Sequence, residues 1–491
     1  MQEKAEDASI TKSHKPPARD FNAMQSRLSA MSEEVKKWKE CVVVHHHDAD
    51  GISAGSIAVQ ALLRKGIAVK HKAIKQLYRE DFEMLLGLGE NFVFVDFGSG
   101  QLSDLKKHFP KNFFVLDHHA PEEGESGTLV EHAFHANPLL FGFDGGNELS
   151  GAGMAYLFAK ALDANNNGLA ALAVVGAVGD MQDLASGKLV GLNSEIVLKD
   201  AVLAGTLEVK NDLRLYGRIS RPLVQMLLFS TSPVLPDLTA KEENCKSFLH
   251  GAGIALSDEH NAIRSYEDLS LEEKKRLSTA LVLHMNSFNV PEWKIQELFG
   301  EVYTLLHEGR KSPLRDAKEF STLLNAVGRH GEPDLGLAVC LGNREQAYAE
   351  ALALLAEHRR QLAQGIELVS GNGLQEFESF YFFDAGEKIK DSIVGIVAGM
   401  LYSSGIIGTD RPIVAMARHD DGTIKVSARA TKDLVRRGLH LGKALRAVCE
   451  KLGGIAEGGG HAIAAGCKIG ENEKEKFLEL MNEEVKNYLG G

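Results

Sequence analysis

The chain has 491 residues, more than one ordinary domain, so its length predicts two to four folding units. A composition with 44% hydrophobic and 25% charged residues is typical of a soluble globular protein and excludes a disordered chain. The net charge of −12 excludes a generally basic coat protein for nucleic acid. The longest apolar run, residues 169–178, is about half of what a bilayer crossing needs, so we expect a buried helix there and no membrane partner.

The five cysteines lie far apart and form no Cys-x-x-Cys pair. This spacing argues against a zinc finger and a disulfide framework, and it predicts a reducing, cytoplasmic location. No charged, apolar and cleavable signal opens the chain. Residues 1–20 are polar and contain proline, so we expect residues 1–40 to form a mobile tail and a leading helix.

The run 41–51 begins as an apolar strand and ends in three histidines, two aspartates and a glycine. If the extended geometry persists, His46, Asp48 and Asp50 point to one side. One imidazole and two carboxylates on one face can hold a hard or borderline divalent cation. The glycine then lets the backbone turn into a helix predicted for residues 52–65. The alternative is a surface turn with acidic helix N-caps.

Two further strand-like runs also end in polar residues. The run 92–98 is apolar on both faces, which predicts a central strand, and it contains Asp96 near its end. The run 113–119 ends in three polar residues, Asp117, His118 and His119. Strand-like and helical runs alternate from residue 41 to about 200, which predicts a parallel sheet with crossover helices. Ligands bind at the carboxyl ends of the strands in such sheets.

A fourth acidic position follows the apolar run 169–178. Asp180 has no lysine or arginine close to it in the sequence, and a carboxylate buried there is costly unless it meets a cation. We therefore expect Asp180 to be a metal ligand, with Asp183 in the same turn as the alternative.

These four segments resemble, in order and approximate spacing, the four motifs of the DHH phosphoesterases. That superfamily includes RecJ-type exonucleases, small-oligonucleotide phosphodiesterases and manganese pyrophosphatases. The matching residues are His46, Asp48, Asp50, Gly51, Asp96, Asp117, His118, His119, Gly179 and Asp180. The segment 319–329 is similar to the Asn-Ala-x-Gly-Arg segment of RecJ-like nucleases, and 458–466 is similar to the glycine-rich motif of the DHH-associated C-terminal domain. The resemblance covers most of residues 41–470 and is strongest to archaeal RecJ-like proteins, including the nuclease associated with the GINS replication complex.

The resemblance implies two divalent cations that share Asp96 as a bridging carboxylate. The implied ligands are His46, Asp48, Asp50, Asp96, His118 and Asp180. Mixed histidine and carboxylate ligands favour manganese over magnesium, with cobalt or zinc as further candidates. We expect Asp117 to orient a histidine ligand. His119, if it is not a ligand, is expected to donate a hydrogen bond to the scissile phosphate or to protonate the leaving group.

The expected fold class is α/β with three parts. They are a parallel-sheet DHH catalytic domain (41–200), a mainly helical connecting region (201–375) with helices at 269–285, 293–306 and 345–368, and a smaller α+β DHH-associated substrate-binding domain (376–491).

The C-terminal part is locally basic, with ten Lys and Arg against four Asp and Glu between residues 411 and 451. The runs 412–418 and 423–429 predict an antiparallel hairpin with one basic face. Glycines allow the backbone to approach a phosphate, and nearby cations neutralise it. We expect substrate contacts from six residues, of which the first two follow from the resemblance alone: Asn325, Arg329, Arg429, Gly459, Gly460 and His461.

The function expected from these features is that of a manganese-dependent exonuclease for single-stranded DNA or RNA. The first alternative is a related phosphoesterase for dinucleotides or nucleotide phosphates. The second is a replication scaffold that binds GINS with little catalysis, like the eukaryotic helicase-activating relative with degenerate DHH motifs. Here all four motifs keep their acids and histidines.

Overall fold

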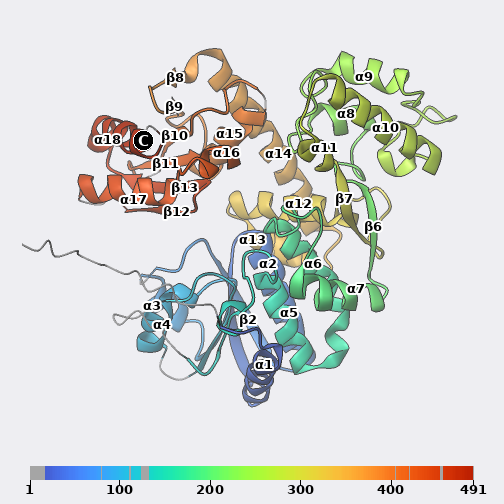
Figure 1. Ribbon diagram of the computed structural model, residues 1–491. Coiled ribbons are helices and arrows are strands. Elements are labelled where there is room, and N and C mark those ends of the chain that lie inside the picture. Colours follow the sequence, from blue (N-terminus) through green and yellow to red (C-terminus); the bar gives the residue numbers. More distant parts are fainter. Residues whose placement is uncertain are drawn as a thin grey trace, which may run out of the picture. The chain divides into compact units, whose positions relative to one another are not determined.

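The computed structural model describes residues 17–78, 80–109, 112–122, 132–403, 405–419, 421–453 and 457–489. Most of the predicted tail, residues 1–16, lies outside the described residues. The chain divides into two compact units, Met1–Glu208 and Val209–Gly491 (Figure 1).

The first unit is built on a five-stranded parallel sheet with the order β2-β1-β3-β4-β5. Its strands are β1 (Glu40–His46), β2 (Ala68–Ile74), β3 (Asn91–Val95), β4 (Asn112–Leu116) and β5 (His135–Ala136). The apolar strand β3 is central, as its pattern predicted. The chain passes from β1 outward to β2 and then returns to β3 on the other side. The ends of β1 and β3 therefore flank the topological switch point, where open α/β sheets bind ligands.

Helices cover both faces of this sheet. Four of them pack together on one face: α1 (Phe21–Val35), α2 (Ala49–Arg64), α5 (Gly151–Leu162) and α6 (Ala170–Gly179). On the other face are α3 (Asp81–Leu86) and α4 (Leu102–His108), whose Phe82 and Leu105 share an apolar cluster with Val42 and Phe92 of the strands. The unit also contains a π-helix, η4 (Asn193–Leu198), and α7 (Lys199–Leu203). The predicted buried helix is confirmed, because α6 is buried throughout residues 170–178.

The second unit contains a six-stranded sheet with the order β12-β13-β11-β10-β9-β8. Its strands are β8 (Leu374–Glu376), β9 (Tyr381–Asp384), β10 (Ile413–Arg418), β11 (Ile424–Arg429), β12 (Glu457–Gly460) and β13 (Ala464–Ile469). The predicted hairpin is confirmed by the antiparallel pairing of β10 with β11. The helices of this part are α15 (Asp391–Ser403), α16 (Lys432–Arg436), α17 (Leu441–Leu452) and α18 (Lys474–Leu489).

The basic face that side-chain alternation predicts for this hairpin is partly covered by a helix. Helix α15 packs on β10 and β11, and it covers the side that carries Ser427 and Arg429. Ser427 is only 5% exposed. Alternation predicts which side chains share one side of the strand, but the sequence does not show which helix covers that side.

The region that connects the two sheets is mostly helical. Its helices are α8 (Leu223–Leu228), α9 (Glu242–Gly251), α10 (Leu271–Ser287), α11 (Glu292–Gln296), α12 (Ala317–Arg329), α13 (Pro333–Cys340) and α14 (Gln346–Leu368). The predicted helix over 293–306 is wrong, because α11 ends early and Phe299–Leu305 forms β7, which pairs with β6 (Leu207–Leu213). Its Val302, Tyr303 and Thr304 are β-branched or aromatic and favour an extended backbone when a partner strand is available.

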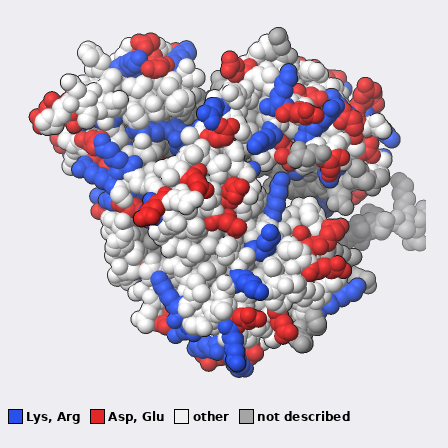
Figure 2. All heavy atoms as spheres, turned by 180° about the vertical axis from the view of Figure 1, so that it is seen from behind, with Lys and Arg blue, Asp and Glu red and all other residues white. Residues whose placement is uncertain are grey.

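In the part of the chain that the structure describes, no helix is both long enough and apolar enough to cross a bilayer. Acidic and basic side chains lie next to one another on the face shown in Figure 2. Some exposed charged residues also form ion pairs within a helix, as in Lys246, which lies 2.8 Å from Glu242 and 2.7 Å from Glu243.

One buried arginine ties several elements of the second unit together. Arg218 is 4% exposed and its Nε donates to Asp316 Oδ2 at 2.8 Å. It also donates to Asp212 Oδ2 and Thr304 Oγ1, each at 3.3 Å. Asp316 is itself buried and caps the N-terminus of α12.

We therefore expect Arg218→Ala to lower the free energy of unfolding by about 3–5 kcal/mol, because it leaves the Asp316 carboxylate buried without its cation. Urea unfolding followed by circular dichroism measures this change. Lys246→Ala is the control, since its ion pairs are exposed and its midpoint should stay at the wild-type value. Equal midpoints for Arg218→Ala and the wild type would contradict the prediction.

Candidate metal centre

Three of the predicted ligands meet at the carboxyl ends of β1 and β3. The Nδ1 atom of His46, the last residue of β1, lies 3.0 Å from Asp48 Oδ2 and 3.7 Å from Asp96 Oδ2. The other ring nitrogen, Nε2, lies 3.1 Å from the carbonyl oxygen of Lys75. A proton on Nε2 can be donated to that carbonyl, which leaves the Nδ1 lone pair for a cation.

The other predicted ligands form a second group around His118. Its Nε2 lies 3.1 Å from Asp96 Oδ1 and 3.6 Å from Asp50 Oδ2. Its Nδ1 lies 2.7 Å from the carbonyl oxygen of Gly145, which holds the ring with Nε2 facing the carboxylates. Asp50, His118 and Asp180 can place ligand atoms within 4.8 Å of one another. Asp96 has one oxygen in each group, which is the arrangement expected of a bridging ligand.

These six residues fit a pair of divalent cations. Adjacent ligand atoms around an ion with bonds near 2.1 Å are roughly 3 Å apart, which matches the shorter separations here. Asp96 Oδ1 is buried and accepts no hydrogen bond from any residue that the structure describes. Burial, together with the charges of Asp50 and Asp48, raises the pKa of Asp96. A cation between these carboxylates would remove that repulsion.

The side chains of His46, Asp48 and Asp50 do converge on the candidate metal centre. The predicted reason, an extended backbone throughout residues 41–51, is wrong. Strand β1 ends at His46 and α2 begins at Ala49. Asp48 is the N-cap of α2 and accepts a hydrogen bond from the backbone N–H of Gly51 at 3.0 Å. The N-cap alternative and the ligand hypothesis therefore describe the same residue, since one oxygen caps the helix and the other faces His46.

Asp50 is fixed by the start of another helix. Its Oδ2 accepts from the backbone N–H of Gly151 at 2.7 Å, and its Oδ1 accepts from that of Ala152 at 3.0 Å. These are the first residues of α5, where free N–H groups and the helix dipole favour a carboxylate. Each oxygen keeps a lone pair for a cation.

Two glycines bring helices close to the carboxylates. A Cβ atom on Gly151 would lie 2.4 Å from Asp96 Oδ1, and one on Gly176 of α6 would lie 2.5 Å from Asp50 Oδ1. Asp96 itself has φ of 65°, a left-handed conformation that aspartate tolerates better than most residues. The close approach of α5 and α6 therefore depends on residues without a side chain.

A residue that the sequence analysis missed holds Asp180 in place. Gln182 is 2% exposed, and its Nε2 donates to Asp180 Oδ2 at 2.9 Å and to the Gly145 carbonyl at 2.8 Å. Its Oε1 accepts from Asn193 Nδ2 of η4 at 2.6 Å. In the sequence, only its position two residues after a candidate ligand points to a role for Gln182. Asp180 belongs to the group around His118, and the alternative ligand, Asp183, does not.

The carboxylate of Asp117 holds the side chain of His119. Its Oδ1 lies 2.8 Å from Nδ1 of His119, whereas it meets His118 only through the backbone N–H, at 2.7 Å. Its Oδ2 accepts from the backbone N–H of Ser99 at 2.9 Å. Burial opposes the charged form of His119, but the hydrogen bond and charge of Asp117 raise its pKa to about 9. Because His119 also lies within ligand reach of Asp96 and His118, both roles expected for it stay open.

The predicted substrate-binding residues all belong to the second unit, and two of its arginines approach one another. Burial and the nearby Arg329 guanidinium lower the pKa of Arg429. Arg329 ends α12, and Asn325 lies one turn earlier on the same helix. Arg429 ends β11, where its Nη1 donates to the Ala428 carbonyl at 2.8 Å. Two positive side chains within electrostatic range of each other favour an anion in their neighbourhood.

The glycine run is a strand and not a loop. Gly459 and Gly460 belong to β12, at the edge of the sheet, and pair with β13. Gly460 is opposite Ala465, and Arg429 is opposite Ala464 on the other side of β13. A Cβ atom on Gly459 would meet nothing within 4 Å, so a ligand can approach the backbone there. The side chain of His461, the next residue, is exposed.

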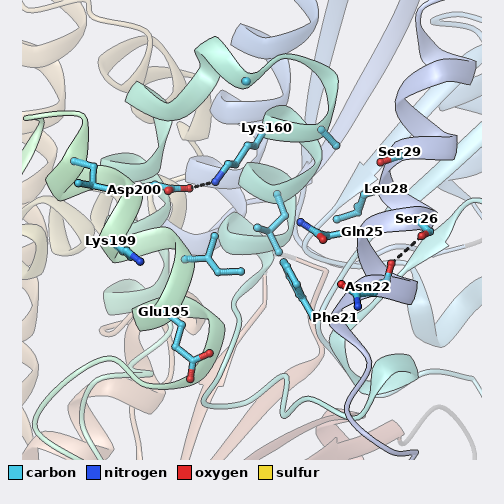
Figure 3. Close-up of a pocket in the computed structure, with 15 residues that line it drawn as sticks. Phe21, Asn22, Gln25, Ser26, Leu28, Ser29, Lys160, Glu195, Lys199 and Asp200 are labelled. Carbon is cyan, nitrogen blue, oxygen red and sulfur yellow. Dashed lines mark hydrogen bonds and ion pairs between the residues drawn. The ribbon is translucent and has the colours of Figure 1, made fainter.

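A cavity of about 1020 Å³ lies elsewhere in the first unit (Figure 3). It is lined by residues of α1, α5, η4 and α7, and its polar lining includes the ion pair between Lys160 and Asp200 at 2.5 Å. It contains none of the predicted site residues. We therefore place the candidate site at the ends of the strands, where the ligand geometry lies.

Three family models match the chain. The DHH family, N-terminal domain, matches residues 40–177, the DHH-CID domain matches 215–299, and the DHHA1 domain matches 378–487. The uncharacterized protein MJ0831 of Methanocaldococcus jannaschii is 31% identical over 479 residues, which cover 95% of this chain and 100% of that protein. The single-stranded-DNA-specific exonuclease RecJ of Escherichia coli is 28% identical over 185 residues, which cover 34% of this chain and only 29% of RecJ.

Solved structures share the fold at low sequence identity. The structure of RecJ from Thermus thermophilus in complex with Mn²⁺ has a TM-score of 0.58 at 18% identity, covering 96% of this chain and 56% of that one. The structure of CDC45 from Entamoeba histolytica has a TM-score of 0.62 at 13% identity, covering 95% and 98%. With its three matching domains and a full-length relative at 31% identity, this chain belongs to the DHH family as a RecJ-like member.

Proposed function

We propose that this protein is a manganese-dependent exonuclease that hydrolyses single-stranded nucleic acid. The observation that carries the proposal is the convergence of six candidate ligand side chains, among them Asp96, one buried oxygen of which accepts no hydrogen bond from the described residues. The RecJ relatives are exonucleases specific for single-stranded DNA, and the alignment with RecJ of Escherichia coli covers 34% of this chain. Two bound divalent cations supply a water of lowered pKa and stabilise the charge on the attacking and leaving oxygens.

The chain's own groups position the reaction. Asp50 and Asp180 are held by the N-terminus of α5 and by Gln182, so their oxygens are oriented before a cation arrives. His119 is held by Asp117 and is 54% exposed as a side chain, so it can reach a phosphate that enters from solvent. With a pKa near 9 it carries its proton at neutral pH and can donate a hydrogen bond to a phosphate oxygen or a proton to the leaving oxygen.

The second unit supports the proposed substrate class. The charge of Arg329 contributes to lowering the pKa of Arg429, and the edge strand β12 leaves Gly459 open to a ligand. We propose that they hold phosphates beyond the scissile one. A long single strand offers such phosphates, whereas a dinucleotide does not. The alternative of a replication scaffold that binds GINS would not need the complete ligand set, and turnover by the purified protein separates the two.

The first prediction concerns the ligand Asp180. Asp180→Asn should lower turnover of a single strand in manganese by roughly 100-fold or more, above the 10–100-fold loss usual for residues that only orient a ligand. Asp183→Asn is the matched control in the same turn, outside the ligand group, and should keep most of the activity. Release of end-labelled nucleotides measures both variants, and the opposite ranking would transfer the ligand role to Asp183.

The second prediction concerns the metal. Activity should disappear in EDTA and return with manganese more fully than with magnesium, because His46 and His118 present imidazole nitrogens. Initial rates in a metal titration give the comparison. Full turnover in EDTA is incompatible with the metal centre, and equal rates in the two metals would indicate that the histidines are not ligands.

The third prediction concerns the distal phosphates. Arg429→Ala should weaken binding of a long single strand and flatten the slope of log K against log salt by roughly 0.7. Hydrolysis of a dinucleotide should change little, because the metal ligands are untouched. Arg436→Ala is the control, an exposed arginine paired with Asp433 in the same part of the chain. Equal losses on both substrates would place Arg429 at the scissile phosphate.

A further inference from the structure

The loop that follows Asp180 reverses the usual distribution of side chains. Its polar residues Gln182 and Asp183 are buried, with exposures of 2% and 4%. Its apolar residues Met181 and Leu184 are exposed, to 65% and 39%. The buried glutamine is explained by its contacts to Asp180 and Gly145, but the exposed apolar pair has no such role in the metal centre.

Met181 is also held in a conformation that suits glycine. Its φ is 60°, in the left-handed region. The N–H of Met181 donates to the Val178 carbonyl at 3.1 Å, and the N–H of Gln182 donates to the Ala177 carbonyl at 3.0 Å. This pair of bonds closes helix α6 with a Schellman motif, in which the left-handed position is usually glycine because a Cβ atom is strained there. A methionine at this position gains nothing for the helix end.

The position of the loop indicates what its apolar side chains meet. Met181 directly follows the candidate ligand Asp180, so their Cα atoms are about 3.8 Å apart. The backbone of Met181 therefore adjoins a candidate ligand, and its side chain is exposed to solvent there. A substrate phosphate bound there carries a sugar and a base, and the base presents an apolar face.

We propose that Met181 and Leu184 form an apolar lip that packs against the nucleobase beside the scissile phosphate; this inference rests on the proposed function. Methionine is unbranched and polarisable, and its sulfur makes favourable contacts with aromatic rings. Such a contact accepts any base, as an enzyme that degrades strands of mixed sequence requires. The lip therefore positions the terminal nucleotide through the apolar face that every base presents, whatever the identity of the base.

The test compares two end-labelled single strands that differ only at the nucleotide to be removed. One carries a normal base and the other a tetrahydrofuran abasic residue. For Met181→Gly, we expect kcat/KM on the normal strand to fall by about ten-fold, mainly through KM, because an apolar contact is lost. Hydrolysis of the abasic strand should remain at the wild-type value. The wild type should itself prefer the normal strand.

Controls separate the contact from the strain. Ala240→Gly removes another exposed left-handed residue, with φ of 64°, and should leave both strands unaffected. Met181→Leu keeps the apolar bulk and should restore most of the preference for the base. The thermal midpoint of Met181→Gly should equal or exceed that of the wild type, since glycine adopts this conformation without strain.

Each remaining outcome decides the inference. Equal losses on the two strands, or no loss on either, would overturn the lip, and equal losses with a lowered midpoint would assign Met181 to packing within the protein. Binding of both strands in Ca²⁺, measured by fluorescence anisotropy, gives a readout that does not need turnover. A wild type that binds the normal strand more tightly but cleaves neither would refute the proposed function while supporting the lip. A wild type that shows no preference in binding or cleavage would refute the lip alone.

Discussion

A single buried carboxylate constrains the elements around the candidate metal centre. Asp96 follows the central strand β3, is 2% exposed and adopts a left-handed backbone, and one of its oxygens has no hydrogen-bond donor among the described residues. A charge placed there is costly unless cations compensate it. The surrounding elements supply further candidate ligands, because β1 brings His46 to one oxygen and the loop after β4 brings His118 to the other.

Helix ends make this concentration of acids tolerable before any cation binds. Asp48 caps α2 and Asp50 accepts two N–H groups at the start of α5, so both carboxylates meet positive helix ends. Gln182 neutralises none of the charge but fixes the direction of Asp180. The carboxylates are therefore oriented by backbone and amide groups, which leaves their remaining lone pairs directed at the cation positions.

The second unit presents the opposite electrostatic problem. Arg329 and Arg429 raise the local positive charge. Helix α15 packs against the Arg429 guanidinium and against Ser427, whose Oγ would lie 3.1 Å from a Cβ atom placed on Gly395 of that helix. Cations gathered in this way favour phosphate groups. The first unit thus contains a cluster that favours cations, and the second unit contains a cluster that favours anions.

Sequence patterns determined the features that depend on local chemistry. The central strand β3, the buried helix α6 and the β10–β11 hairpin follow from apolar runs and turn residues, and the strand-end acids and histidines identified the ligand candidates. Periodicity did not separate the helix from the strand at Phe299–Leu305, because β7 forms only when β6 is present to pair with it. Likewise, only the tertiary structure decided that Asp117 contacts His119, that α15 covers Arg429 and that α5 anchors Asp50. Those contacts join residues from different elements, and a side chain's partner depends on how the elements pack, whereas its chemistry is already fixed by its residue type.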